Sequence, residues 1–330
     1  MDNTIRYAFA NQDGIYKDDA FSAVPSWKET LLIFAKNKGA IAGVIFITLM
    51  VILAVWGPSF NSYPYDYVQV DRQNLPPRIP GLEKLGIFDG TLNGMNMYEM
   101  KGCTDEYYWF GTDTLGRDLF TRFCQGTRIS LIVAIVSAIL DLLIGVSYGL
   151  IAGYYGGKVD MIMMRITEII NGIPSLVVVS LLVVILSPGL TSIIIAMVIS
   201  GWIGMSRLVR ANTLRLKASE HILASKTLGT STFKILFREI FPNLLSSVIV
   251  MAMMSVPGAI FMESFLSFVG LGIPAPQASL GSLISDGYNH MLIYPYQLAI
   301  PAVFFGLLMI SLNLFGDGLR DALDPKQKKM

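Results

Sequence analysis

Few side chains in the sequence belong to the types that carry out chemistry, and their spacing does not build a catalytic centre. The chain has two histidines, His221 and His290, and two cysteines. It contains no H-E-x-x-H metal motif, no G-x-S-x-G nucleophile motif and no G-x-x-x-x-G-K-[ST] phosphate loop. The nearest approach to a phosphate loop, Gly156-Gly157-Lys158-Val159, lacks the spacing and the hydroxyl. The sequence therefore predicts a protein that is not an enzyme, and any ATP that drives it must be hydrolysed by another subunit.

The composition excludes most classes of soluble protein. Of the 330 residues, 53% are hydrophobic and 15% are charged, whereas soluble domains carry about 25% charged residues. The aliphatic and aromatic content also excludes a largely disordered chain. A net charge of +1 leaves no basic excess for nucleic acid to bind. Two cysteines are too few for a disulfide framework or a Cys-rich zinc site.

The apolar residues gather in stretches close to the length of about 20 residues that a spanning helix needs. The six stretches are Gly39–Trp56, Ile129–Gly153, Asp160–Ser187, Leu190–Ser206, Leu244–Val269 and Leu298–Phe315. The first stretch runs into Trp56-Gly57-Pro58 without a small-x-small cleavage pattern, so we expect a retained signal anchor. The sequence thus predicts an all-α membrane protein with six transmembrane helices.

The lysines and arginines predict the orientation, because cytoplasmic loops carry an excess of them. Most lie before Gly39, near Lys158, between Arg207 and Arg238, or after Phe315. Both termini and the 207–242 loop are therefore expected to be cytoplasmic, and the 57–128 and 270–297 loops external. The predicted order is a cytoplasmic tail 1–38, a first span 39–56, a long extracytoplasmic loop 57–128, a core 129–316 and a cytoplasmic tail 317–330.

Five ionisable residues fall inside the apolar stretches: Asp141, Asp160, Arg165, Glu168 and Glu263. Charges within a membrane are costly and often functional. Arg165 and Glu168 stand at i,i+3 near the start of the third stretch, where we expect a local ion pair. Asp141 lies about midway along the second stretch and is the better candidate for a buried polar contact. A proton-coupled carrier usually needs more such groups, which disfavours that mechanism.

The 57–128 loop is rich in proline, glycine, asparagine and tyrosine, a composition that favours turns and extended chain. It is interpreted either as a small cap or contact surface, or as a solvated connection. Cys103 and Cys124 share this external loop, so they form either a disulfide or two free thiols.

The 207–242 loop is the most informative segment. It holds seven basic residues against Glu220 and Glu239, a net charge of +5. Helix-compatible residues run from 208 to 228, Gly229 interrupts them, and Thr230-Ser231-Thr232 offers caps for a second helix. Pro242 is expected to end that helix before the fifth stretch begins. Taken alone, this pattern fits a positive-inside loop as well as a docking element.

Here the sequence resembles the EAA loop of ABC-importer permeases. The family pattern is E-A-A, three residues, G, nine residues, then I-x-L-P. Leu223-Ala224-Ser225, Gly229 and Phe241-Pro242 fit its spacing. The departures are Leu223 for Glu, Ser225 for Ala, Glu239 for Ile and Phe241 for Leu.

Three further stretches are similar to signatures of peptide permeases. Gly111-Thr112-Asp113-Thr114-Leu115-Gly116-Arg117-Asp118, with Arg122, Gly126, Arg128 and Ser130 after it, resembles GTDxxGRD. Residues 263–272 resemble ESxLSFLGLG, and residues 313–325 resemble NxxGDxLRDxLDP. The resemblance covers roughly residues 27–326, and it matches the C-type permease of dipeptide and oligopeptide importers (OppC/DppC-like).

The resemblance implies a type I ABC importer permease fold, with coupling helices in the cytoplasmic loop. It also implies a bacterial cytoplasmic membrane, a second B-type permease, two ATPases that bind ATP and Mg²⁺, and an external peptide-binding protein. The chain itself would bind no cofactor and no metal. Leu223, Ala224, Ser225 and Gly229 would lie in the coupling helix that docks on an ATPase. Asp113, Arg117 and Asp118 would either contact the external partner or only set the packing of the helix that follows.

Two other classes of function stay open at this point. The first is an ion-gradient-driven secondary carrier, which would need no ATPase. The second is a membrane-embedded enzyme, which would need a constellation that the sequence lacks. Within the importer class, permeases that resemble this chain carry peptides, nickel or oligosaccharides, and the sequence does not choose among them.

Overall fold

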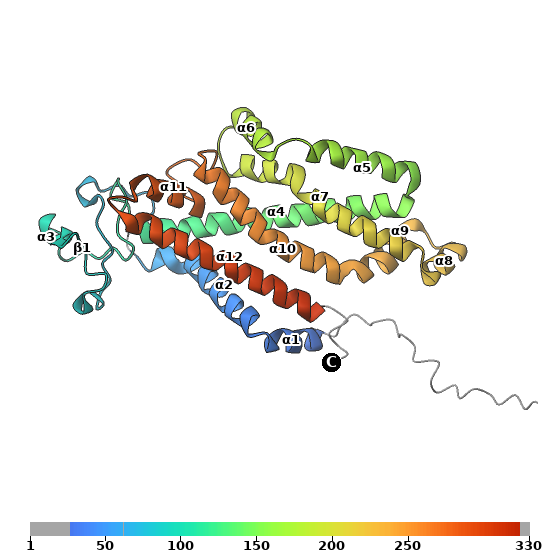
Figure 1. Cartoon of the computed structure of the whole chain (residues 1–330), viewed down its shortest axis with the longest axis horizontal. Helices are drawn as coiled ribbons and strands as arrows, with labels where there is room; N and C mark the ends of the chain where they lie inside the picture. The colour runs from blue at the N-terminus through green and yellow to red at the C-terminus, as the bar shows by residue number, and fades with distance from the viewer. Residues whose placement is uncertain (1–26, 62, 324–330) are drawn as a thin grey trace, which may run out of the picture.

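The computed structural model describes residues 27–61 and 63–323. The predicted tail residues 1–26 and 324–330, with Asp324 and Pro325 of the last motif, lie outside the described residues. Within the described part, the chain forms a bundle of long helices with an irregular cap at one end (Figure 1).

The apolar stretches form the long helices of the bundle. They are α2 (Lys38–Trp56), α4 (Leu119–Tyr155), α5 (Gly157–Asn171), α6 (Ser175–Leu186), α7 (Leu190–Lys217), α10 (Phe241–Phe268) and α12 (Pro295–Leu323). In the part of the chain that the structure describes, five helices are long and apolar enough to cross a membrane, or six if α5 and α6 are one span. The predicted third span is therefore wrong as a single helix: α5 and α6 meet at a bend of 77°. The reason is Pro174, which lacks an N–H and restricts the residue before it.

Shorter elements fill the ends of the bundle. They are α1 (Trp27–Lys36), α3 (Met97–Met100), α8 (Glu220–Thr227), α9 (Thr232–Lys234) and α11 (Leu280–His290). A two-stranded antiparallel hairpin joins β1 (Thr91–Leu92) to β2 (Met95–Asn96), and Leu92 pairs with Met95. The sequence reading did not predict α11, which lies inside the 270–297 loop. At 37 residues, α4 also takes up the end of the predicted 57–128 loop.

The closest packing in the bundle joins α4 to α7. Gly145, Gly149 and Gly153 recur every fourth residue on the face of α4 that meets α7. A Cβ on these glycines would lie 2.6 Å from Met205 Cβ, 2.7 Å from Val209 Cβ and 2.7 Å from Thr213 Cβ, respectively. Each contact joins residues 60 apart, so the two helices run parallel in constant register. Glycines on such a face let two backbones approach, and dispersion then holds the helices together where lipid offers no hydrophobic driving force.

The charged residues near the start of α5 divide between local and long-range pairs. Arg165 Nη1 lies 2.8 Å from Glu168 Oε2 on the exposed surface, which confirms the predicted i,i+3 ion pair. Asp160 instead pairs with Arg210 of α7 and joins the two helices.

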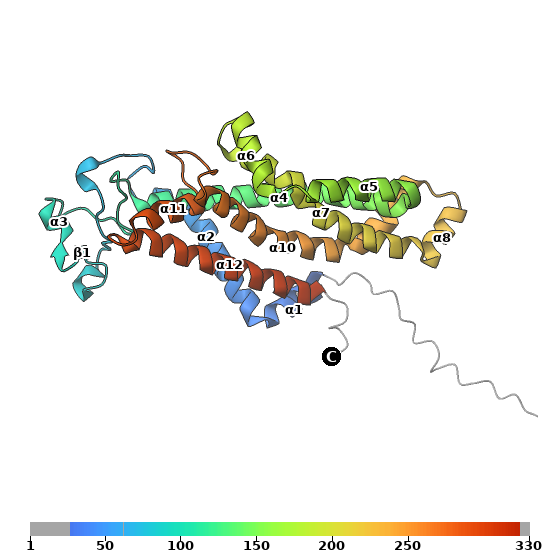
Figure 2. The same cartoon turned by 45° about the horizontal axis from the view of Figure 1, so that its top comes forward.

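The cap and the basic loop lie at opposite ends of the bundle. Figures 1 and 2 show β1 and α3 at one end and α8 at the other, with α1 and the end of α12 lying together away from the cap. The rings of Phe34 in α1 and Phe315 in α12 are 5.7 Å apart, which confirms this neighbourhood. The helices therefore separate the segments into two sides, as the charge pattern predicts.

The cap is folded and has its own core. Leu75, Tyr98, Cys103 and Tyr108 are buried together in it. Arg72 forms a two-pronged pair with Glu106, with Nη2–Oε1 and Nε–Oε2 distances of 2.8 and 2.9 Å. This arrangement supports the cap interpretation over the solvated connection, and its turns and short strands match the proline- and glycine-rich composition.

Candidate functional site: a basic loop and an external polar junction

The basic loop begins where α7 breaks. A single helix over 208–228 is not formed: α7 ends at Lys217 and α8 starts at Glu220. At the break, both the N–H and the hydroxyl of Ser219 donate to Leu216 O, at 2.9 and 2.6 Å, in place of an α-helical bond. Residues 208–228 therefore form the end of α7 and the separate helix α8, joined by a short turn.

Gly229 ends α8 as the sequence predicts. Its φ of +79° is a left-handed conformation that favours glycine. The N–H of Gly229 donates to Lys226 O and that of Thr230 to Ser225 O, each at 3.1 Å. This pair of bonds is the Schellman arrangement, which satisfies the last carbonyls of a helix.

The second helix of the loop continues into the membrane instead of stopping. It begins at Thr232 and runs through a π-helical segment, Ile235–Ile240, into α10. The prediction that Pro242 ends the helix is wrong. Pro242 stands in the first turn of α10, just after the π-helical segment. The hydrogen-bond register changes at this point, and the change compensates for the N–H that proline lacks. Ser231 occupies the cap position without a side-chain bond.

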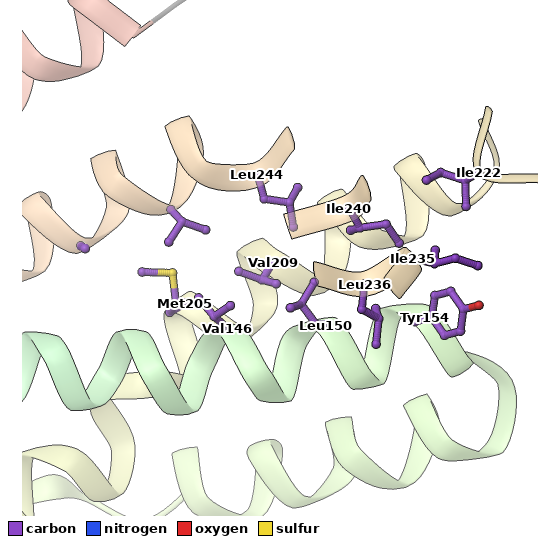
Figure 3. Packing of buried hydrophobic residues seen from close by; sticks show 12 residues of the cluster. Val146, Leu150, Tyr154, Met205, Val209, Ile222, Ile235, Leu236, Ile240 and Leu244 are labelled. Carbon is purple, nitrogen blue, oxygen red and sulfur yellow. The ribbon is translucent and has the colours of Figure 1, made fainter. Parts of the chain in front are cut away.

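The loop has a buried inner face and an exposed outer face. On the inner face, Ile222, Ile235, Leu236 and Ile240 pack with residues of α4 and α7 such as Leu150 (Figure 3). On the outer face, Leu228 and Phe233 are 85% and 70% exposed, and Leu223 and Phe237 are also exposed. The inner face attaches the loop to the bundle, and the outer face leaves an apolar surface with no contact in the described chain to cover it.

The residues matched to the EAA pattern lie on or beside this outer surface. Leu223, Ala224 and Gly229 are exposed, and Ser225 is half-buried. Phe241 and Pro242 are half-buried at the start of α10. The sequence reading missed Leu228, Phe233 and Phe237. The sequence feature that could have identified them is their apolar character in a strongly charged loop, with Phe233 and Phe237 one helical turn apart.

At the opposite end, the loop before α4 forms a tight polar turn. Asp113 Oδ1 accepts from Leu115 N and Arg117 N at 2.8 and 2.9 Å, and its Oδ2 accepts from Arg117 Nε at 2.7 Å. Gly111 (φ +80°) and Gly116 (φ +74°) allow the backbone to fold around this carboxylate. The turn is thus held from inside by a side chain that the sequence reading offered as a partner contact.

Asp118 is the N-cap of α4. Its Oδ2 accepts from Thr121 N at 2.7 Å, from Thr121 Oγ1 at 2.6 Å and from Asn61 Nδ2 at 2.9 Å. The side chain is almost wholly buried, and this burial raises the pKa of Asp118 despite the hydrogen bonds that oppose the shift. Asp113 and Arg117 are buried as well. The structure therefore favours the packing alternative over direct contact of these three residues with an external partner.

A second polar cluster joins the peptide-permease signatures. Glu263 of α10 is fully buried, and it accepts hydrogen bonds from Ser130 Oγ of α4 at 2.7 Å and from Ser267 Oγ at 2.8 Å. Ser279, the N-cap of α11, donates to Ser267 Oγ at 3.0 Å. The segments that resemble GTDxxGRD and ESxLSFLGLG, far apart in sequence, are therefore bonded side chain to side chain.

Arg122 extends these polar contacts toward α11. We call the polar turn 111–118, the cluster around Glu263 and Arg122 together the polar junction. Its Nε lies 3.6 Å from Asp113 Oδ2, and its Nη2 lies 3.6 Å from Asp286 Oδ2. Gln297 at the start of α12 donates to Thr112 O and to Asn74 Oδ1, both at 3.0 Å. The junction thus ties the cap to three helices of the bundle.

The two cysteines are free and buried in different clusters. Cys103 donates to Tyr98 O inside the cap, and Cys124 packs in the bundle against Gly57. The disulfide alternative is therefore not formed. His221 in α8 and His290 in α11 lie in helices at opposite ends of the bundle, so they do not share a centre (Figure 1).

A bundle of candidate spanning helices with an exposed loop at one end and a folded cap at the other is the architecture of a multi-pass membrane protein. Residues 145–329 match the family described as binding-protein-dependent transport system inner membrane component, and residues 26–77 match the N-terminal TM domain of oligopeptide transport permease C. The chain is 45% identical over 303 residues to the oligopeptide transport system permease protein OppC of Bacillus subtilis, covering 92% of this chain and 90% of that protein. It is 44% identical to the dipeptide transport system permease protein DppC of the same organism, covering 89% and 84%.

Among solved structures, the chain is similar to one described as inward facing conformations of the MetNI methionine ABC transporter. The TM-score is 0.51 at 19% identity, and the match covers 62% of this chain and 96% of that one. This likeness concerns the fold, which is that of a type I ABC importer permease.

The chain belongs to the binding-protein-dependent transport family, in the branch of oligopeptide and dipeptide permeases. It is a multi-pass membrane protein and a permease subunit of an ABC importer, a non-catalytic class of component.

Proposed function

We propose that this chain forms half of the translocation pathway of an ATP-driven importer for oligopeptides or dipeptides. A second, B-type permease would supply the other half, and an extracytoplasmic peptide-binding protein would deliver the cargo to the capped end. Two cytoplasmic ATPases would bind ATP and Mg²⁺. The basic end of the bundle, with both termini, would face the cytoplasm of a bacterial cell, as the lysine and arginine distribution predicts.

The observation that carries the proposal is the apolar outer surface of the basic loop. Leu223, Leu228, Phe233 and Phe237 are exposed although the loop is strongly charged. Burying one such side chain contributes roughly 1.5–3 kcal/mol, so a partner that covers this surface gains binding energy. We assign the surface to the ATPase, with α8 and Gly229 as the part that docks.

The attachment of the loop explains how docking could move the helices. Ile222, Ile235 and Ile240 pack into the cluster shared with α4 and α7, and α10 continues from the loop without a break. Closure of the ATPases would therefore act directly on three spanning helices. ATP shifts the equilibrium between inward-open and outward-open states only if the docked ATPases stabilise one state more than the other.

The test compares two exposed leucines at opposite ends of the bundle. Leu228 is 85% exposed in the basic loop, and Leu292 is 91% exposed in the turn before α12. Leu228→Asp should reduce the ATPase subunits recovered with the tagged complex by at least tenfold in mild detergent, whereas Leu292→Asp should leave recovery unchanged. A bulky residue at Gly229 should behave like Leu228→Asp while membrane insertion is retained.

The same preparation distinguishes the alternatives. Peptide uptake into proteoliposomes that persists without ATP, together with no ATPase recovery from the wild type, would support an ion-gradient carrier. Uptake of nickel or oligosaccharide in place of peptide would keep the importer and change its cargo.

A further inference from the structure

Asp141 has a different environment from the other carboxylates in the spanning helices. It lies near the middle of α4, one turn before Gly145, on the face that meets α7. The residue opposite is Gly201, where an added Cβ would collide with the carboxylate of Asp141. The register of 60 residues that relates α4 to α7 holds here too, so the missing side chain of Gly201 creates the space that Asp141 occupies.

The carboxylate of Asp141 is not paired within the described chain. Its Oδ1 is buried without a hydrogen-bond partner. By contrast, Glu263 accepts from serines, Asp160 pairs with Arg210 and Glu168 pairs with Arg165. A charge at the centre of a membrane is costly, so such a residue is by default a functional one whose partner must be found. No cation of the described chain fills that role.

The surroundings of Asp141 favour a transiently bound partner. The side chain is half-buried, and both Gly201 and Gly204 of α7 are exposed. A Cβ on Gly204 would lie 3.3 Å from Met251 Cε of α10. Met197, one turn before Gly201, is half-buried, whereas Met205, one turn after it, is buried in the core between α4 and α7. Unbranched thioether side chains adapt to many shapes and are common at promiscuous binding surfaces.

We propose that Asp141 binds the α-ammonium group of a peptide cargo within the pathway. This inference rests on the proposed peptide importer. The α-ammonium is the positive charge that every peptide with a free amino terminus shares, whereas the side chains vary. One carboxylate beside two exposed glycines and the half-buried Met197 recognises that shared charge without distinguishing the side chains of the cargo.

The test uses the complete complex of both permeases and both ATPases, without the binding protein, so that binding-protein selectivity does not intervene. Trialanine and N-acetyl-trialanine serve as probes, and their affinities are measured from the ligand-dependent rise in Tm. The wild type should bind trialanine at least tenfold more tightly than the acetylated probe. Asp141→Asn should lose this preference, and Glu168→Gln, which removes an exposed carboxylate, should keep it. Gly201→Ala, which retains the charge but fills its space, should also weaken trialanine binding.

Four outcomes would overturn the assignment. An unchanged preference in Asp141→Asn makes the carboxylate a passive packing group. Dissociation of the two permeases in Asp141→Asn, seen by size exclusion, identifies the partner as a basic side chain of the second permease. If the wild-type complex transports no peptide, the proposed function fails and this inference with it. Normal uptake with an unaffected Asp141→Asn removes the Asp141 assignment alone.

Discussion

The basic loop and the external polar junction each contain a sequence signature, and they use their residues in opposite ways. In the loop, Leu228 and Phe233 point outward and are largely exposed. In the junction, Asp118 and Glu263 are buried and bonded within the chain. The loop signature lies partly on α8, and one junction signature lies on α10. Both helices end in the same way, because Gly270 closes α10 with the same Schellman bonds that Gly229 makes for α8. The loop signature leaves apolar side chains exposed, whereas the junction signature bonds distant segments of the subunit to one another.

The difference predicts that equivalent substitutions will have unequal effects on stability in the two regions. Removing an internal bond costs free energy of unfolding in the isolated chain. Removing an exposed group should leave that free energy unchanged and affect assembly with a partner.

The largest effect is expected at Glu263. Glu263→Ala leaves the hydroxyls of Ser130 and Ser267 without their acceptor in a buried site, so the free energy of unfolding should fall by about 3 kcal/mol. The control in the basic loop is Glu220→Ala, an exposed glutamate in the first turn of α8, which should cost about 0.5 kcal/mol. Thermal unfolding in detergent measures both. Equal losses of stability would contradict the division into internal and external roles.

Two glycines with nearly the same φ give the next comparison. Gly111 (φ +80°) and Gly229 (φ +79°) both have a left-handed backbone conformation, which an alanine adopts only at a cost in free energy. At Gly111 the new Cβ would also lie 2.8 Å from Tyr296 Cε2, whereas at Gly229 nothing lies within 4 Å. Gly111→Ala should therefore cost about 3 kcal/mol and Gly229→Ala about 1 kcal/mol. A larger loss of stability at Gly229 would show that the loop is more tightly packed than its exposure indicates.

The two helix caps predict a smaller difference. Asp118→Ala removes the N-cap bond to Thr121 N and should cost about 1–2 kcal/mol. Ser231→Ala, at a cap position without a side-chain bond, should cost less than about 0.5 kcal/mol. Thermal unfolding in detergent, with circular dichroism as the signal, separates the two values. A costly Ser231→Ala would mean that its hydroxyl bonds in the assembled protein.

The smallest effect concerns the response of the cap to acid. Hydrogen bonding to Arg72 lowers the pKa of Glu106 below its ordinary 4.5. The stabilisation from this pair is therefore present above pH 4.5 and is lost as the pH falls through the lowered pKa in the folded state. It amounts to about 1 kcal/mol or less for a partly exposed pair. The rate of hydrogen exchange of cap amides, corrected for intrinsic rates, should rise as the pH falls below 4.5. Glu106→Gln should remove this pH dependence. A cap that loosens equally in Glu106→Gln would assign the acid response to another group.

Several structural features of this protein follow from the sequence alone, because they depend on local composition. The apolar stretches predicted the spanning helices, the basic residues predicted which segments share an end of the bundle, and Gly229 predicted the turn after α8. These features depend on properties of single segments, such as hydropathy and the conformational freedom of glycine, and they need no knowledge of neighbours.

Contacts between distant segments decided the rest. Pro174 divides one apolar stretch into two bent helices, whereas Pro242 interrupts nothing because a π-helical segment precedes it. The sequence left open whether Asp113 and Asp118 contact a partner or set the packing of α4, and the fold buries both of them. The parallel register of α4 and α7 places Asp141 against Gly201, 60 residues away. Residue types set which groups are available for bonding, and only the tertiary fold settles which of them are already paired and which are left for a partner.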